Sequence, residues 1–179
     1  MIALTLTFSK AQQQDAEQLA ALVNSAYRGE VSRQGWTTEV DLLDGRRTEA
    51  AELERLIADA NSIILLCKHA SELVGSIHLE RNVEQVQFGM LAVNPSLQGR
   101  GIGKQLLQSA ELAAQQAWPV NTFIMAVISS RHELIAFYER RGYRRTGITK
   151  AFPVNPALWT AKVADLQLEF LEKSVIDHP

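Results

Sequence analysis

A strand pattern, a glycine-rich turn and a helix pattern follow one another between residues 84 and 118, and a second strand pattern covers Thr122 to Val127. Apolar residues alternate with others over 84–93, which is the period of a β-strand. Residues 102–118 carry apolar residues three and four apart, and this helix must end before Pro119. A helix that connects two neighbouring strands is a crossover, and a crossover requires the two strands to be parallel. The sequence therefore predicts a βαβ unit with its glycine turn at the start of the helix.

Further elements are predicted on both sides of this unit. Helix spacing covers residues 16–27, 50–60 and 134–141, and strand patterns cover 62–68, 73–80, 143–149 and 165–173. Strands 62–68, 73–80 and 84–93 follow in series and predict an antiparallel meander. No repeat or linker divides the chain, and 46% apolar residues in 179 are enough for one core. We therefore predict a single domain over residues 1–179, of mixed α/β class.

Composition excludes several classes of protein. The 18 Lys and Arg against 20 Asp and Glu give a net charge of -2, so the sequence predicts no nucleic-acid partner. The apolar run 63–67 is too short to cross a membrane. Cys67 is the single cysteine, and the histidines show no metal-ligand spacing, so we expect no disulfide and no metal site. Because the N-terminal residues lack the pattern of a signal peptide, we expect a cytoplasmic protein.

The glycine turn is the most informative segment for function. Gly99, Gly101 and Gly103 precede a helix N-terminus, where free backbone N–H groups and the helix dipole favour a phosphate or pyrophosphate. Arg100 and Lys104 can add charged contacts. The spacing matches neither a P-loop nor a dinucleotide-binding fingerprint. A purely structural turn that joins a strand to a helix is the alternative.

Two motifs together resemble a known family. The loop Gln98-Gly-Arg-Gly-Ile-Gly103 resembles the Q/R-x-x-G-x-G/A loop of the GNAT superfamily of N-acetyltransferases. The segment Phe137-Tyr-Glu-Arg-Arg-Gly142-Tyr143 resembles the second element of that family, and Leu91 to Pro95 resembles the strand end that leads into the loop. The resemblance spans roughly residues 15–173, and it implies a central, mostly antiparallel sheet flanked by helices, the GNAT fold.

This resemblance implies that the chain binds acetyl-CoA. The pantetheine arm is expected on the backbone of Leu91, Ala92 and Val93, in a gap where this strand and strand 122–127 splay apart. The residues implied to form the pyrophosphate cradle and the rest of the cofactor site are Gln98, Gly99, Arg100, Gly101, Ile102, Gly103 and Lys104.

The same resemblance assigns catalytic roles. Tyr138 stands where family members carry the tyrosine proposed to protonate the CoA sulfur, although it also fits an apolar helix stripe that packs in the core. The position of the glutamate base of many relatives falls on Ala126, which cannot accept a proton. Glu84 is the nearest substitute that we predict, with Glu39, Glu80, His78 or a water as further candidates. Arg131 replaces an asparagine that often steadies the cofactor in the family.

Residues 28–47 correspond to the segment that walls the amine pocket in the family. We predict that Trp36 stacks on the acceptor and that Glu39 pairs with its ammonium group. The arginines of this segment can instead hold a carboxylate, and Trp36 can simply anchor the loop.

The predicted function is acetyl transfer from acetyl-CoA to a primary amine of a small molecule or amino acid. Acetylation of a protein or peptide N-terminus, and acyl-CoA binding without turnover, remain the alternatives. The sequence leaves a homodimer open.

Overall fold

The computed structural model describes residues 4–175, so the two ends of the predicted 1–179 domain, residues 1–3 and 176–179, lie outside the described residues. Within this range one mixed sheet has the strand order β1-β3-β4-β5-β6-β9-β7. The strands are β1 (Leu6–Lys10), β3 (Ser62–His69), β4 (Glu72–Asn82), β5 (Gln85–Val93), β6 (Thr122–Ile128), β7 (Arg144–Ala151) and β9 (Gln167–Ser174). All neighbours are antiparallel except β5 and β6, which are parallel.

Four α-helices and short 3-10 turns complete the described chain. The helices are α1 (Ala16–Tyr27), α2 (Ala50–Ala58), α3 (Ile102–Ala117) and α4 (His132–Glu139), and the 3-10 turns are Gln13–Asp15, Glu30–Gln34 and Pro95–Leu97. A two-stranded ribbon pairs β2 (Leu43–Gly45) with β8 (Trp159–Ala161). The predicted βαβ unit (β5, α3, β6) and the predicted meander (β3, β4, β5) are both confirmed.

The structure adds three strands that the sequence patterns did not predict: β1, β2 and β8. The last two have three residues each, which is too short for a period to show. The structure also inserts the last strand, β9, between β6 and β7. No local pattern encodes this strand order, because it depends on contacts between distant parts of the chain.

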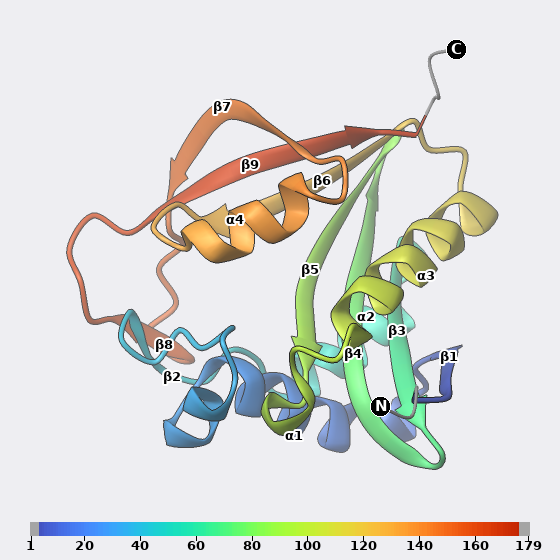
Figure 1. The fold of residues 1–179 in the computed structure, drawn as a ribbon, viewed down its shortest axis with the longest axis horizontal. Helices are drawn as coiled ribbons and strands as arrows, with labels where there is room; N and C mark the ends of the chain where they lie inside the picture. Colours follow the sequence, from blue (N-terminus) through green and yellow to red (C-terminus); the bar gives the residue numbers. More distant parts are fainter. Residues whose placement is uncertain (1–3, 176–179) are drawn as a thin grey trace.

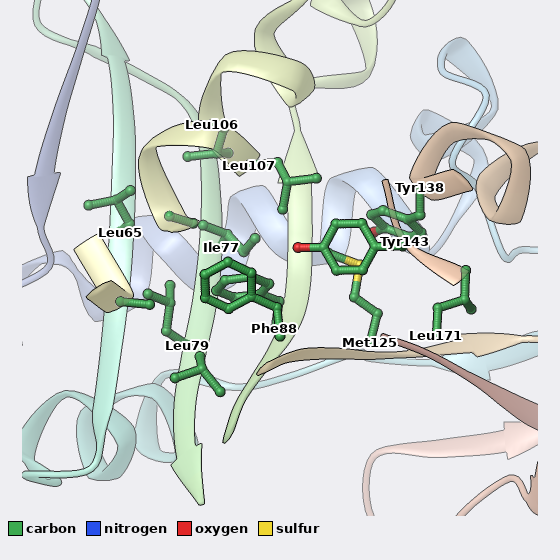
Figure 2. Packing of buried hydrophobic residues seen from close by; sticks show 14 of the residues in the cluster. Leu65, Ile77, Leu79, Phe88, Leu106, Leu107, Met125, Tyr138, Tyr143 and Leu171 are labelled. Carbon is green, nitrogen blue, oxygen red and sulfur yellow. The ribbon is translucent and has the colours of Figure 1, made fainter. Parts of the chain in front are cut away.

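The sheet is covered on both faces (Figure 1). Alternate residues of β3 face opposite sides, so Ile64 and Leu66 pack with α1 and α2 while Leu65 packs with α3. On the α3 side, Leu106 and Leu107 lie above Phe88 of β5 (Figure 2). The two apolar layers fix the position of β5, which carries residues of both clusters.

The sheet opens between its two parallel strands. Pairing of β5 with β6 runs only from Gln85 opposite Thr122 to Phe88 opposite Met125, although both strands continue beyond these residues. The register of β4 against β5 shifts at this point, and Met90 has a left-handed φ of 48°. A bulge bends its strand, so β5 turns away from β6 toward the start of α3 (Figure 1). The predicted splay is therefore present, and the β5 backbone beyond Phe88 is released from β6.

Candidate active site

Two cavities lie at the opening between β5 and β6. The first, which we call the glycine-turn cavity, has a volume of about 310 Å³ and is lined by Gly99, Gly101 and Gly103 together with residues of α4. The second, the arginine cavity, has a volume of about 270 Å³ and is lined by Arg28, Glu39, Arg47, Arg131 and Tyr138, among others. Leu91 and Leu134 line both cavities. The two cavities therefore meet at the end of the β5–β6 pairing.

The glycine turn has the conformation that its composition favours. Gly99 and Gly101 have φ of 78° and 80°, and a Cβ added at either one would meet no atom within 4 Å. Gly101 is the N-cap of α3, a 16-residue helix whose first N–H groups have no partner of their own in the helix. Such an end favours a negatively charged group.

The residues expected to contact a cofactor are mostly brought together here. Leu91, Val93, Gln98, Gly99, Gly101, Ile102, Gly103 and Lys104 all line the glycine-turn cavity. Ala92 is fully buried in the layer formed with α1 and α2, so its side chain does not line this cavity. Arg100 is exposed and does not line it either.

Three residues of the second motif line the same cavity. Phe137 was not among the expected cofactor residues, and the basic run with Arg140 and Arg141 favoured a solvated face over a contact with a phosphate of CoA. Phe137, Arg140 and Arg141 enter the cavity from the end of α4. The guanidinium of Arg141 lies 3.5 Å from the centroid of the Phe137 ring, and its Nη1 donates to the Phe137 carbonyl over 2.6 Å. Its Nε is buried without a hydrogen-bond partner among the described residues. The run of arginines in the sequence was the available signal.

Gln98 uses its whole side chain to hold a neighbouring loop. Its Oε1 accepts from the backbone N–H of Trp36 (2.8 Å) and of Thr37 (3.3 Å), and its Nε2 donates to Thr37 Oγ1 (2.8 Å) and to the Val93 carbonyl (3.1 Å). No amide donor or acceptor of this side chain is left for a phosphate. Gln98 therefore fixes the 36–37 loop against the glycine turn, in contrast to the direct cofactor contact that the sequence predicts.

The structure separates Trp36 from Glu39. The Trp36 ring lines the glycine-turn cavity and lies 5.8 Å from the Phe137 ring, centroid to centroid, whereas Glu39 lines the arginine cavity. The bonds from Gln98 to the backbone of Trp36 hold the tryptophan on the cofactor side. The predicted single pocket for an amine, formed by both residues, is therefore not present.

Glu39 is engaged by two arginines. Its carboxylate accepts from Arg28 Nη1 through one oxygen and from Arg131 Nη1 (2.9 Å) through the other. All three side chains are at most 10% exposed. Arg131 also donates to the Thr37 carbonyl over 2.5 Å. The predicted pairing of Glu39 with a substrate ammonium would require these bonds to break, so the structure argues against that role.

Two buried tyrosines, Tyr27 and Tyr138, line the arginine cavity. Tyr138 packs beside Tyr143, with 5.9 Å between ring centroids (Figure 2). Burial raises the pKa of Tyr138 above its usual value, so the hydroxyl is protonated at neutral pH. Burial likewise raises the pKa of Tyr27 to about 12, and its hydroxyl donates to the Leu91 carbonyl. The sequence showed Tyr27 only as part of a helix face.

Glu84, the predicted base, lies far from the junction of the two cavities. It precedes β5, accepts from Asn121 Nδ2 over 2.9 Å, and stands at the opposite end of the strand from Leu91. At a rise of about 3.3 Å per residue, the seven steps along the chain from Glu84 to Leu91 correspond to roughly 23 Å. This placement removes Glu84 from the reacting centre.

Two of the remaining candidate bases, Glu80 and His78, line neither cavity. Glu80 is exposed near the same end of the sheet as Glu84. His78 is buried against Ser62, with 2.8 Å between Nε2 and Oγ. Glu39 is the only carboxylate among the described residues that line the arginine cavity.

A wall that the sequence did not predict closes the arginine cavity. Phe152, Pro153 and Trp159 line it from the segment between β7 and β9. The β2–β8 ribbon ties this segment to residues 43–46, for example through the Arg46 N–H, which donates to the Leu158 carbonyl over 2.7 Å. Two distant parts of the chain therefore line this cavity.

Among residues 4–175, no three His, Cys, Asp or Glu side chains come together as a group that could hold a metal ion. No helix in the same range has the length and apolar character needed to span a bilayer.

The buried His78 predicts a pH dependence of stability. Burial lowers its pKa to about 4 from an ordinary value of 6.5, so the unfolded chain takes up this proton first as the pH falls. The contribution of neutral His78 to the free energy of unfolding is fully present above pH 6.5. It should be lost as the pH falls from 6.5 to 4, by about 3 kcal/mol in total. Urea unfolding at several pH values measures this loss. Between pH 6.5 and 4 the free energy of unfolding should fall less for His78→Gln than for wild type, whereas the exposed control His132→Gln should keep the pH dependence of the wild type.

A second prediction concerns Gly35. A Cβ at this position would lie 2.4 Å from Gln98 Oε1, so Gly35→Ala should displace the Gln98 side chain and break its bonds to the 36–37 loop. We expect a loss of about 1–3 kcal/mol in the free energy of unfolding. In a Gln98→Ala background, Gly35→Ala should lower the free energy of unfolding much less. Additive losses in the double mutant would contradict the proposed clash.

Comparison with known proteins agrees with this geometry. Residues 31–153 match the acetyltransferase (GNAT) domain family. No curated protein matches the sequence significantly. Among solved structures, YncA from Salmonella typhimurium, a putative acetyltransferase determined with its cofactor acetyl-CoA, has a TM-score of 0.70 at 16% identity and covers 98% of this chain and 96% of its own.

Two further solved structures have named acceptors. The ribosomal-protein-S18-alanine N-acetyltransferase of Escherichia coli has a TM-score of 0.68 at 13% identity, covering 98% of this chain and 97% of its own. A spermidine N-acetyltransferase SpeG chimera from Vibrio cholerae and hSSAT has a TM-score of 0.68 at 18% identity, covering 94% of this chain and 95% of its own. At such identities the likeness shows the fold. The family match covers more than half of the chain, and the protein therefore belongs to the GNAT family of acetyltransferases.

Proposed function

We propose that the protein transfers an acetyl group from acetyl-CoA to a primary amine of a small molecule. The observation that carries this proposal is the meeting of the two cavities at Leu91, where β5 leaves β6. One cavity suits a phosphate-bearing ligand and the other suits a compact acceptor, so the reacting groups of two substrates would meet at their junction.

Several features of the glycine-turn cavity fit acetyl-CoA. The free N–H groups at the start of α3 and the positive charge of Lys104 suit a pyrophosphate. The Nε of Arg141, buried and without a hydrogen-bond partner in the described part of the chain, is a further donor for an anionic group. The released edge of β5 at Leu91 and Val93 provides backbone groups that can pair with the amides of a pantetheine arm. Bound there, acetyl-CoA supplies its acetyl group as an activated thioester.

Transfer forms one C–N bond, breaks one C–S bond and moves one proton from the amine to the sulfur. Tyr138 is the group that we propose beside the sulfur, because it lines the acceptor cavity close to the junction and keeps its proton at neutral pH. Since its pKa is raised above that of a thiol, complete proton transfer to a free thiolate would be uphill. Tyr138 therefore keeps its proton and donates a hydrogen bond to the sulfur as charge develops there, and the sulfur takes up the proton that the amine loses.

A small acceptor is favoured over a protein terminus. The arginine cavity holds only about 270 Å³, and its lining includes Arg28 and Glu39 together with Phe152 and Trp159 from a distant part of the chain. A protein N-terminus would need an open groove at this place. Because the two relatives named above act on a ribosomal-protein alanine and on spermidine, the fold alone does not select the acceptor.

Acetyl-CoA should stabilise the protein. At about 100 times its Kd, a ligand that binds only the folded state adds about 2.7 kcal/mol, or roughly 5–10 °C in Tm for a chain of this size. Gly101→Glu should abolish this shift, because it places a negative side chain in the anion site. Gly147→Glu is the matched control, since Gly147 also has a positive φ of 79° and open space around its Cβ. Equal shifts in both variants would contradict a role for the turn in binding.

Turnover should depend on the Tyr138 hydroxyl. Tyr138→Phe should lower kcat by about 100-fold, as expected on loss of a hydrogen-bond donor that stabilises the charge developing on sulfur. The shift in Tm that acetyl-CoA causes should stay unchanged. Tyr143→Phe is the control, because the Tyr143 hydroxyl donates to Glu111 (2.9 Å) and lines neither cavity. Release of CoA with a panel of amines measures kcat. Acetyl-CoA binding without CoA release for any amine would instead support a non-catalytic acyl-CoA sensor.

A further inference from the structure

The guanidinium of Arg28 has two donors without a partner among the described residues, and Arg28 lines the arginine cavity. Arg28 directly follows α1, and only 5% of its surface is exposed. Its Nη1 donates to Glu39, whereas its Nε and Nη2 are buried and have no hydrogen-bond partner within residues 4–175. In a planar guanidinium, Nε–H and Nη2–H form one edge with two parallel donors. The bond to Glu39 fixes the other side of the group, so this edge is held in place.

Such an edge is costly to leave unpaired. Buried donors of a charged group lose the hydrogen bonds that water would provide, and native structures satisfy almost all of them. Buried side-chain atoms without a partner are few in the described part of the chain: these two, Ser76 Oγ and Arg141 Nε. Two of the four therefore belong to one side chain that lines the proposed acceptor cavity. A ligand with two acceptor oxygens in one plane would satisfy both, and a carboxylate has this geometry.

The charge of the cavity also favours an anion. Among the described residues that line it, Arg28, Arg47 and Arg131 are cationic and Glu39 alone is anionic. Glu39 is already shared between Arg28 and Arg131. The Arg47 backbone is held by its N–H bond to Asn24 Oδ1 (2.7 Å), and no ion pair of its guanidinium is present within residues 4–175. An acceptor with several positive charges would meet repulsion here, whereas an acceptor that carries a negative group would be attracted.

We propose that the acceptor is an amine that carries a carboxylate, that is, an amino acid or a similarly small amino acid derivative, and that the Nε and Nη2 edge of Arg28 binds this carboxylate. The inference rests on the proposed acetyltransferase function and names its substrate class. With the carboxylate at Arg28, the amine extends toward Leu91 and Tyr138, where the cavities meet. Phe88, Phe152 and Trp159 line the same cavity and offer an apolar surface to the body of the acceptor.

The first test compares each amino acid with its own carboxamide as acceptor for the wild-type protein. The two molecules differ only in the negative group, and the carboxamide has the larger fraction of neutral amine at a given pH. Chemical reactivity therefore opposes the expected result. We expect kcat/KM to be about 10- to 100-fold higher for the acid, read as CoA release. Equal or faster reaction of carboxamides or polyamines would overturn the proposal.

The second test changes the donor edge. Arg28→Lys keeps a positive charge next to Glu39 but removes the parallel donors. Arg28→Lys should raise KM for the acid at least tenfold and change kcat less. The ratio of kcat/KM for the acid to kcat/KM for the carboxamide should then fall close to one. Arg33→Met is the control, because Arg33 lies in the same segment but pairs with Asp41 and Glu30 on the surface and does not line the cavity. An unchanged ratio in folded Arg28→Lys would overturn the proposal, and if this variant does not fold, the wild-type comparison decides.

A binding measurement separates failure of this inference from failure of the proposed function. Calorimetry of the wild-type protein with N-acetyl amino acids and with their carboxamides tests carboxylate recognition without turnover. Tighter binding of the acids by at least tenfold supports the inference even if no amine releases CoA. Absence of any preference for the acids overturns it. The proposed function fails separately, if acetyl-CoA neither shifts the Tm nor releases CoA with any amine.

Discussion

The site depends on the point at which β5 and β6 stop pairing. Up to Phe88 and Met125 the two strands share a ladder, and the apolar layers on both faces hold them in place. Beyond it, the left-handed Met90 and the shifted register with β4 turn β5 away. Backbone groups are expensive to leave unpaired inside a protein, so an opening of this kind is stable only where a ligand, water or side chain takes the place of the missing strand. The Tyr27 hydroxyl, bonded to the Leu91 carbonyl, is one such replacement.

The segment that follows α1 connects the two cavities. Gln98 holds its 36–37 backbone against the glycine turn, and Arg131 ties Thr37 and Glu39 to the start of α4. A displacement of this segment would therefore alter the cofactor side and the acceptor side together. Arg131, in which the sequence departs from the family pattern, supplies the bond that closes this arrangement.

Local patterns were sufficient for the βαβ unit, the meander and the glycine turn, because strand period, helix spacing and left-handed glycines are properties of short segments. They were not sufficient for the acceptor pocket. Trp36 and Glu39 are close in sequence, yet bonds to Gln98 and to Arg131, which lies 92 residues from Glu39, place them in different cavities. Glu84 failed for a related reason: it directly precedes β5, at the opposite end of the strand from Leu91. Contacts across such separations decide on which side of a gap a side chain lies.

The buried cluster of Arg28, Glu39 and Arg131 is better explained by recognition than by stability. Two cations and one anion with at most 10% exposure carry a large desolvation cost, and apolar residues of similar size often stabilise a fold as well or better. If the cluster served stability alone, the charges would be expected to balance and every donor to be paired. Instead, one positive charge is in excess within the cluster, and two donors of Arg28 have no partner in the described chain. A negatively charged acceptor would remove both the excess charge and the unpaired donors at once, which makes the arrangement favourable only when substrate is bound.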